Sequence, residues 1–321
     1  MKKLVAAAFV TLLSTNAALA EWPERPIALI VPWSAGGSTD LIARKLASGL
    51  EKELGQPVNV VNIVGGSGVI GHQGMVSAAP DGYTLGTPSP DITTYYWTGM
   101  AEFNQTDITP LALLGVEPAS FIVSESSKWT TLREALDDIK ASPQGTYKMM
   151  GSPAGSGYHL AISTLFESQG IDPNRVVLVP TQGASASMQE LAAGGIDFVF
   201  SSLAEGKGMI EAGRARGLAV LADKRNEAFP DIPTVEEAIG DPVAAGSWRG
   251  LIGPKGLPAD IVGKIDAAAQ RVVASDDFVD FYKKSGFGMG FLDAAGFAQF
   301  LDEQAERNGR LIKALGLSKR D

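Results

Sequence analysis

Cysteine is absent from the 321-residue chain, and histidine occurs only twice, as His72 and His159. Without cysteine the protein has no disulfide framework, no thiol nucleophile, no thiolate metal site and no cysteine for a lipid anchor. Two histidines are too few for a metal site built from several imidazoles. We therefore expect neither a bound metal nor a cofactor.

Basic residues are fewer than acidic ones, 27 against 36, which gives a formal net charge of -9. A nucleic-acid-binding protein needs a basic face, and this composition predicts none. An anionic ligand would have to be attracted by local geometry, because the overall field of an acidic protein repels it.

Long apolar runs are also missing, since no segment has the roughly 18 continuous apolar residues of a membrane span. The first 20 residues instead have the features of a secretory signal peptide: Lys2 and Lys3, an apolar stretch over 4–13, and the small-x-small site 18–20. Cleavage after Ala20 predicts an exported, periplasmic protein without a lipid anchor. It leaves 25 basic and 36 acidic residues.

Glycine is plentiful, and the stretch 26–46 joins a strand, a glycine turn and a helix start. The apolar run 27–31 predicts a buried strand. Gly36 and Gly37 allow backbone conformations closed to other residues, and residues 38–40 are typical helix N-caps. Free N–H groups and the helix dipole would then point into the turn, so a carboxylate or phosphate could bind there without Lys or Arg.

Strand-like and helix-like segments alternate along the rest of the chain. Strands are expected at 27–31, 58–64, 83–87, 111–116, 120–123, 147–150, 176–179, 196–201, 218–221 and 248–253. Helices are expected at 38–54, in a short segment ending before Pro80, and at 131–141, 158–168, 185–193, 258–274, 278–284 and 294–315. Residues 88–105 read as loop and irregular helix. The βαβαβ start predicts a parallel sheet with right-handed crossovers.

The chain length and its 45% hydrophobic content suffice for two cores, so we expect two α/β domains joined by a hinge. The chain is predicted to cross between them near 120–125 and 248–253. Residues 21–122 plus 248–321 would form the first domain and residues 123–247 the second. Glycine turns at 33–40 and 151–157 would face each other across a cleft, where small ligands usually bind.

Two local patterns allow an enzyme interpretation and also a simpler structural one. Gly66 to Gly71 matches the dinucleotide fingerprint, but the helix that follows is short and belongs to the second strand, which favours a plain helix-start turn. Ser156 and His159 would be the pair of a serine hydrolase, although no G-x-S-x-G elbow surrounds the serine. His159 either lines the cleft or supports its turn, and His72 is expected to be structural or on the surface.

Three further side chains have a structural and a functional interpretation. Trp33 and Trp248 could flank a ligand, but a tryptophan beside a buried strand is more often core. Arg249 would be a counter-charge for an anion or the member of a salt bridge near the hinge. Asp40 is expected to organise hydrogen bonds in its turn, because two negative charges in one turn repel.

Several runs together resemble the receptor family of the tripartite tricarboxylate transporters, also called Bug or TctC-like proteins, periplasmic solute receptors related to the citrate-binding receptor. The runs, in family order, are WPERPIALIVPWSAGGSTDLIARKL, LGQPVNVVNIVGGSGVIG, AAPDGYTL, GSPAGSGYHLA, LAAGGIDFVF, GRARGLAV, FPDIPTVEEAIG and WRGLIGPKGLP. They extend from Trp22 to Pro258 and cover most of the mature chain.

The resemblance implies a type II periplasmic-binding-protein fold that closes on a carboxylate held by main-chain N–H groups and small hydroxyls. The implied ligand-binding residues are Trp33, Ser34, Ala35, Gly36, Gly37, Ser38, Thr39, Asp40, Ser152, Gly155, Ser156, Gly157, His159, Gln182, Gly183 and Ala184. Family members often carry an aromatic residue and then a lysine where this chain has Thr181 and Gln182. The chain departs from the family there, in the segment that helps to select the rest of the ligand.

The function expected from these features is that of a monomeric periplasmic receptor without catalytic activity. It would bind a small organic acid, a di- or tricarboxylate above all, and deliver it to the membrane permease of a tripartite transporter. The alternatives are an exported serine hydrolase using Ser156 and His159, and a receptor that serves a signalling sensor. No nucleic-acid partner is expected.

Overall fold

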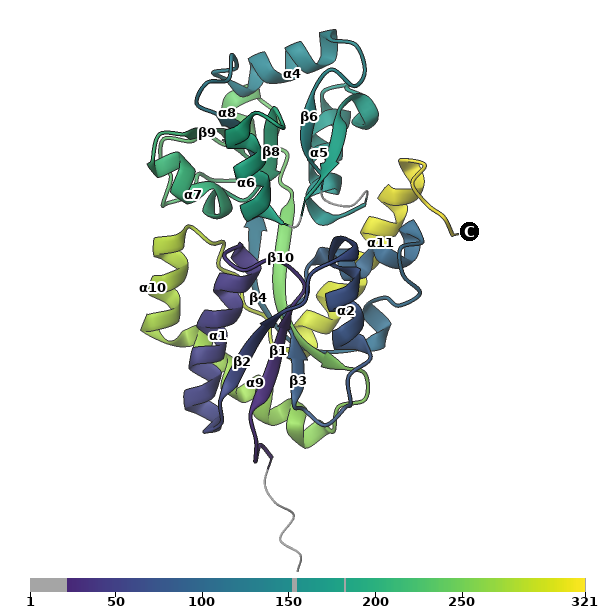
Figure 1. Ribbon diagram of the computed structural model, residues 1–321, viewed down its shortest axis with the longest axis vertical. Coiled ribbons are helices and arrows are strands. Elements are labelled where there is room, and N and C mark those ends of the chain that lie inside the picture. The colour runs from purple at the N-terminus through teal and green to yellow at the C-terminus, as the bar shows by residue number, and fades with distance from the viewer. Residues whose placement is uncertain (1–21, 152–154, 182, 321) are drawn as a thin grey trace, which may run out of the picture.

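A computed structural model describes residues 22–151, 155–181 and 183–320 (Figure 1). The predicted signal peptide with its cleavage site, Ser152 and Gln182 lie outside the described residues. The chain forms two five-stranded sheets, each packed with helices, which lie one above the other in Figure 1. The predicted two-unit α/β architecture is therefore confirmed.

The first sheet has the strand order β2-β1-β3-β10-β4. Its strands are β1 (Ile27–Val31), β2 (Val58–Asn62), β3 (Thr84–Gly86), β4 (Ile108–Pro118) and β10 (Gly246–Pro254). β1 pairs in parallel with β2 and β3, as the βαβαβ prediction requires, whereas β10 lies antiparallel between β3 and β4. A strand from late in the chain thus inserts into a sheet that is otherwise built from residues 27–118.

Helices cover both faces of this sheet. They are α1 (Ser38–Leu54), α2 (Val69–Val76), α3 (Tyr95–Thr98), α9 (Ala259–Ala274), α10 (Asp276–Ser285) and α11 (Ala294–Ala314), with the 3₁₀ turns η1 (Gly66–Gly68), η2 (Pro90–Thr93) and η3 (Gln105–Asp107). Successive side chains of β1 point to opposite faces: Leu29 packs in the cluster of α1 and α9, and Ile30 packs in that of α2 and α11. Burial on both faces explains why β1 reads as a continuous apolar run.

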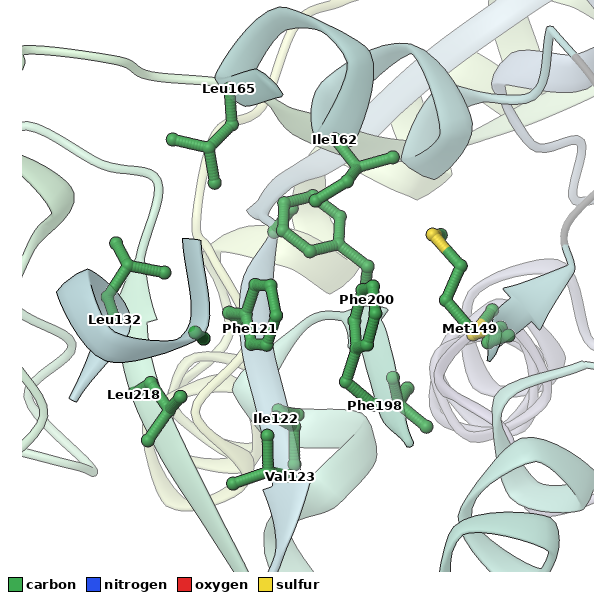
Figure 2. Close-up of a cluster of buried hydrophobic side chains, with 14 of the residues drawn as sticks. Phe121, Ile122, Val123, Leu132, Met149, Ile162, Leu165, Phe198, Phe200 and Leu218 are labelled. Atoms are coloured by element: carbon green, nitrogen blue, oxygen red, sulfur yellow. The ribbon is translucent and has the colours of Figure 1, made fainter. Parts of the chain in front are cut away.

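The second sheet has the order β7-β6-β8-β5-β9. Its strands are β5 (Ser120–Ser124), β6 (Lys148–Gly151), β7 (Val177–Pro180), β8 (Phe198–Ser201) and β9 (Ala215–Val220), and its helices are α4 (Leu132–Ala141), α5 (Gly157–Ser168), η4 (Pro173–Arg175), α6 (Ala184–Ala193), α7 (Leu203–Glu211) and α8 (Val235–Ile239). Figure 2 shows its core, where Phe121 and Phe198 stack with ring centroids 4.4 Å apart. Ile162 and Leu165 of α5 pack above these rings, so the aromatic core fixes α5 on the sheet.

The chain passes between the sheets at two places. β4 continues into β5 through Ala119, and the chain returns between Leu221 and the start of β10. Three backbone hydrogen bonds join these segments: Leu221 N to Ala119 O (2.8 Å), Ala119 N to Ala245 O (2.9 Å) and Ala245 N to Leu221 O (3.2 Å). The sheets therefore change at Ala119 and Ala245, a few residues before the predicted boundaries of 122/123 and 247/248. We propose these two residues as the domain boundaries. At the first of them β4 runs into β5 without a loop, so the sequence has no signal that marks the change.

Most predicted elements agree with the structure to within a few residues, including the Thr131 cap of α4 and the left-handed Gly55 that ends α1. α7 was not predicted, because Gly206 and Gly208 interrupt its apolar pattern. Among the described residues, no helix combines the length and the apolar character that a bilayer span requires.

Candidate functional site

A small pocket lies between the two sheet units, where three helices begin. Its volume is about 50 Å³. The lining residues are Trp33, Ser34, Gly37, Ser38, Thr39, Ser89, Asp91, Ser247 and Arg249 from the first unit and Met150, Ser156, Gly157, Tyr158, Gly183, Ala184 and Glu205 from the second. The first turns of α1, α5 and α6 all contribute, so the turn at 33–40 and the described residues Ser156 and Gly157 of the third glycine turn meet in one pocket.

The N-cap residue of α1 does not pair with the amides of the first turn through a side chain. Gly37 is the N-cap residue and has no side chain to accept a hydrogen bond from the first turn. The amides of that turn are the ones a helix cannot satisfy itself, so they are available to a ligand. Asp40 does not line the pocket. It accepts hydrogen bonds from Gly36 N (2.9 Å), Arg44 Nε (3.0 Å) and Asn62 Nδ2 (2.9 Å).

These bonds give Asp40 the organising role that the sequence predicted. Burial alone would raise the pKa of Asp40, but the hydrogen bonds from Arg44, Gly36 and Asn62 lower it below its ordinary value. The carboxylate stays charged and locks the glycine turn in place.

The start of α5 is held by Ser156 and His159. The Ser156 hydroxyl accepts a hydrogen bond from His159 N (3.3 Å), and His159 Nδ1 accepts one from Gly155 N (3.0 Å). Burial lowers the pKa of His159 to about 4, so the ring is neutral and carries its proton on Nε2. Within the described part of the chain, no hydrogen bond links the Ser156 hydroxyl to the His159 ring. This geometry supports the turn and does not build a nucleophile.

The start of α6 brings a third loop onto the first turn. Its N-cap, Gly183, has φ +125°, a conformation that other residues rarely adopt, and no side-chain cap. A Cβ at Gly183 would lie 3.4 Å from Ser34 Oγ, so the two loops nearly touch.

Three helix starts make this pocket suited to an anion. Each partial positive charge typically stabilises a nearby anion by about 0.3–1 kcal/mol, and up to about 2 kcal/mol where it is partly buried. Amides that point into the pocket can donate hydrogen bonds to the same anion. A carboxylate could therefore be held there by the main chain.

Arg249 is the cation of the described lining, and the surrounding residues already engage it. Its Nη2 donates to Ser38 Oγ (2.8 Å) and lies 3.2 Å from Glu117 Oε2 and 3.5 Å from Glu205 Oε1. Its Nη1 donates to Trp248 O (2.9 Å) and to the Ser247 hydroxyl. Ser38 Oγ in turn donates to Glu205 Oε1 (2.7 Å). Because Ser38 belongs to the first unit and Glu205 to the second, this cluster ties the two units together.

Glu117 has the least well paired carboxyl group of this cluster. Its carboxyl group is buried and neither oxygen accepts a hydrogen bond of good geometry, although Arg249 lies at ion-pair distance. Burial raises the pKa of Glu117 to about 7, against the attraction of Arg249. The carboxyl groups of the cluster are thus only partly paired in this structure.

The second glycine turn, Gly66 to Gly71, contacts His72, which in turn contacts the pocket residue Ser89. His72 is buried, not on the surface; its Nδ1 lies 2.8 Å from Gly68 O, and its Nε2 accepts a hydrogen bond from Ser89 N (3.2 Å). Trp33 Nε1 donates to Ser89 Oγ (3.2 Å). The helix after this turn, α2, has only eight residues. The turn and His72 therefore help to position Ser89.

The predicted site residues fall into three groups. Trp33, Ser34, Gly37, Ser38, Thr39, Ser156, Gly157, Gly183 and Ala184 line the pocket. Ala35, Gly36, Asp40, Gly155 and His159 do not, and Ser152 and Gln182 lie outside the described residues. Trp248 packs in the core against Phe297 and Phe300, as its structural interpretation expected.

Sequence reasoning missed several lining residues: Ser89, Asp91, Met150, Tyr158, Glu205 and Ser247. One of them had a usable signal. Ser202 and Glu205 form a capping box three residues apart, which would have marked α7 and its acidic first turn.

The sequence and the fold are both similar to those of known proteins. A sequence model described as "Tripartite tricarboxylate transporter family receptor" matches residues 42–317. The "UPF0065 protein in gbd 5'region" of Cupriavidus necator is 32% identical over 302 residues, covering 93% of this chain and 90% of that protein.

Two solved structures are similar over nearly the whole chain. The "Structure of periplasmic binding protein BugD" has a TM-score of 0.84 at 26% identity and covers 93% of this chain and 100% of that one. "R. palustris Rpa4515 with adipate" has a TM-score of 0.85 at 26% identity and covers 93% and 99%. The family and these neighbours are periplasmic solute-binding receptors and not enzymes. The chain belongs to the tripartite tricarboxylate transporter receptor family.

Proposed function

We propose that this receptor binds a small organic acid, a di- or tricarboxylate above all, in the pocket between its two units. One carboxylate would lie on the first-turn amides of α1, α5 and α6, beside the hydroxyls of Ser38 and Ser156. The observation that carries the proposal is the convergence of three helix N-termini on one pocket in a member of this receptor family. The adipate bound to a solved relative supports the same ligand class.

We expect the ligand to enter and leave the pocket by a movement of the two units. The ligand would enter when the units separate about Ala119 and Ala245 and would be enclosed when they come together again. Separation would break the hydrogen bond from Ser38 to Glu205, so this contact would stabilise the closed form.

We further propose that the closed, loaded form is the one that a membrane permease of the tripartite transporter recognises. A ligand that bridges the units favours closure by its differential affinity for the two forms, and closure changes the surface that a partner meets. The protein would act as a monomer in the periplasm, after cleavage behind Ala20. N-terminal sequencing of the exported protein tests the cleavage, and uptake by vesicles that carry the permease tests delivery. A response of a sensor kinase without uptake would favour the signalling alternative.

Melting temperature in the presence of an organic-acid panel tests the binding proposal. We expect saturable stabilisation by one class of acid, with no product detectable by NMR. The variant Gly37→Val should abolish that stabilisation and keep the ligand-free melting temperature, because φ at Gly37 is -77° and its Cβ position has only one neighbour, Ser34 O at 3.7 Å. Gly263→Val, in open space on α9, is the matched control and should bind normally. Stabilisation of Gly37→Val equal to that of the wild type contradicts this site.

A further inference from the structure

Glu117 is a buried carboxyl group at the point where the chain leaves the first unit. It lies on β4 two residues before Ala119 and is 1% exposed. Its strand partner is Ser247 of β10, so both side chains lie on the same face of the sheet as Arg249. Among the described residues, neither oxygen of Glu117 has a hydrogen-bond partner. Such unpaired buried groups are rare in native structures and call for an explanation.

The charges around Glu117 do not balance. Arg249 Nη2 lies 3.2 Å from Glu117 Oε2 and 3.5 Å from Glu205 Oε1, so two carboxyl groups share one guanidinium. Glu205 also accepts a hydrogen bond from Ser38 Oγ (2.7 Å), whereas no described residue donates one to Glu117. A third acid, Asp91, interacts with the same arginine from the pocket wall. With all of these acids ionised, the cluster would hold an excess of negative charge, which burial makes costly.

The other groups that face Glu117 come from both units, and none of them is a cation. Tyr282 of α10 packs against Gly115, since a Cβ there would lie 3.1 Å from its ring, and its hydroxyl has no partner among the described residues. Tyr158 of α5 and Glu205 of α7 interact with Glu117 from the second unit. Burial raises the pKa of both tyrosines well above the ordinary value, so they stay uncharged.

A proton on Glu117 would remove this imbalance. Glu205 would remain as the carboxylate that pairs with Arg249, and Glu117 would become a neutral group, whose burial costs far less. The demand for the proton depends on the position of the units, because Glu205 and Tyr158 belong to the second unit and would leave Glu117 when the units separate. Water could then solvate an ionised Glu117.

We infer that Glu117 is a proton-binding site coupled to the movement of the units: it takes up a proton when they close on a ligand and releases it when they separate. The inference rests on the proposed binding function and adds the control of that function by pH. Since coupling between two binding sites is reciprocal, a ligand that drives proton uptake must itself bind more tightly as the proton concentration rises. The receptor would thus bind the acid and one proton together.

The size of the effect follows from two pKa values. Burial raises the pKa of Glu117 to about 7 with the units together, against the attraction of Arg249 and with the help of Glu205. A solvated glutamate has a pKa of about 4.3. The closed form therefore holds more protons between these values, and ligand binding should tighten as pH falls from 8 toward 5. We expect uptake of about 0.1 proton per ligand at pH 8, about 0.5 at pH 7 and about 0.9 at pH 6, with an affinity about tenfold higher at pH 6 than at pH 8.

Calorimetric titration with succinate, glutarate and adipate tests the inference on the wild-type protein. Titrations of the acid that binds most tightly, at each pH in two buffers of different ionisation enthalpy, give the number of protons taken up. At pH 7 these acids are fully charged, so uptake there comes from the protein. His72 and His159 should not contribute, because each is hydrogen-bonded within its own unit.

The outcomes of this titration separate the inference from the function on which it rests. Binding with less than about 0.1 proton taken up at pH 7 overturns the inference and leaves the binding function intact. If neither these acids nor any other in the melting-temperature panel binds, the proposed function itself fails, and the inference fails with it.

Two matched glutamine variants assign the proton to its site. Glu117→Gln keeps the size of the side chain but cannot take up a proton, so it should bind the acid with no uptake at pH 7 and with affinities that agree within about twofold between pH 6 and pH 8. Glu125→Gln is the control, because Glu125 is the 54% exposed partner of Arg216, and it should keep the wild-type uptake. Uptake that persists in Glu117→Gln overturns the assignment. Should that variant not fold, the proton count of the wild type still decides whether binding and protonation are coupled.

Discussion

Replacing Arg249 with methionine should destabilise the protein strongly and in a pH-dependent manner. The guanidinium lies between Glu117 and Glu205, whose side chains are 1% and 5% exposed. Arg249→Met fills a similar volume but leaves both carboxyl groups without their cation. Removal of one partner from a buried ion pair typically costs about 3–5 kcal/mol, because an uncompensated buried charge remains.

The pH dependence follows from the protonation that relieves such a charge. A glutamate has a pKa of about 4.3 in an unfolded chain, and each pH unit above that value adds about 1.4 kcal/mol to the free energy of keeping it protonated. Glu117 already has a pKa of about 7 in the wild type, so the charge that the substitution newly strands is mainly that of Glu205. Neutralising one such buried carboxyl group costs about 5 kcal/mol at pH 8 and about 1 kcal/mol at pH 5. Because the folded variant binds more protons than the unfolded chain over this range, its stability falls as pH rises. We expect Arg249→Met to lose about 3–5 kcal/mol at pH 8 and about 1–2 kcal/mol at pH 5.

Urea unfolding at pH 8 and pH 5, followed by circular dichroism and by tryptophan fluorescence, measures both values. The control is Arg271→Met, the same substitution in a pair with Glu53 where the arginine side chain is 57% exposed. Such a surface pair contributes at most about 1 kcal/mol, with little change between the two pH values. A loss below about 1 kcal/mol for Arg249→Met at pH 8, or an equal loss at both pH values, refutes the description of Arg249 as the buried cation that stabilises these carboxyl groups.

Three further predictions concern the turns and helices around the pocket. Asp40→Ala should lower the free energy of unfolding by about 1–3 kcal/mol, because Gly36 N and Asn62 Nδ2 lose their acceptor; a urea midpoint unchanged from the wild type contradicts this. Burial lowers the pKa of His159 to about 4, so the contribution of its neutral ring to folding stability is complete above pH 6.5 and is lost as pH falls toward 4. His159→Asn removes this titration and should flatten the pH profile of the unfolding free energy between these values by up to about 3 kcal/mol. An unaltered slope in that range would count against a buried neutral ring. Gly208→Ala, at an open position inside α7, should raise stability by about 0.5–1 kcal/mol, and a lower melting temperature would show that the position is constrained.

The parts of the site that could be predicted are local in sequence. The turn from Trp33 to Asp40 follows β1 directly and precedes α1, so its shape is determined by a few neighbouring residues. The cap of α5 is similar, because Ser156 and His159 are three residues apart and bond within one turn. Strands of the first sheet could also be predicted from local patterns. β1, for example, is buried on both faces and therefore reads as a continuous apolar run.

The parts that could not be predicted depend on contacts between distant segments. Ser38 meets Arg249 across 211 residues and Glu205 across 167, and neither spacing has a local pattern. Arg249 reaches the pocket only because β10 inserts antiparallel between β3 and β4, which no neighbouring residue specifies. Asp91 lies on a turn in a segment without clear periodicity, so its position on the pocket wall could not be anticipated.

The measurement that tests the central claim most directly is the shift of backbone amide resonances on titration of the labelled protein with a bound acid. If the main chain of three helix starts holds the carboxylate, the amides of Ser38, Thr39, Gly157 and Ala184 should show the largest downfield proton shifts and saturate together at one affinity. Resonances that shift elsewhere on the surface, while these four stay in place at saturating acid, would contradict the account.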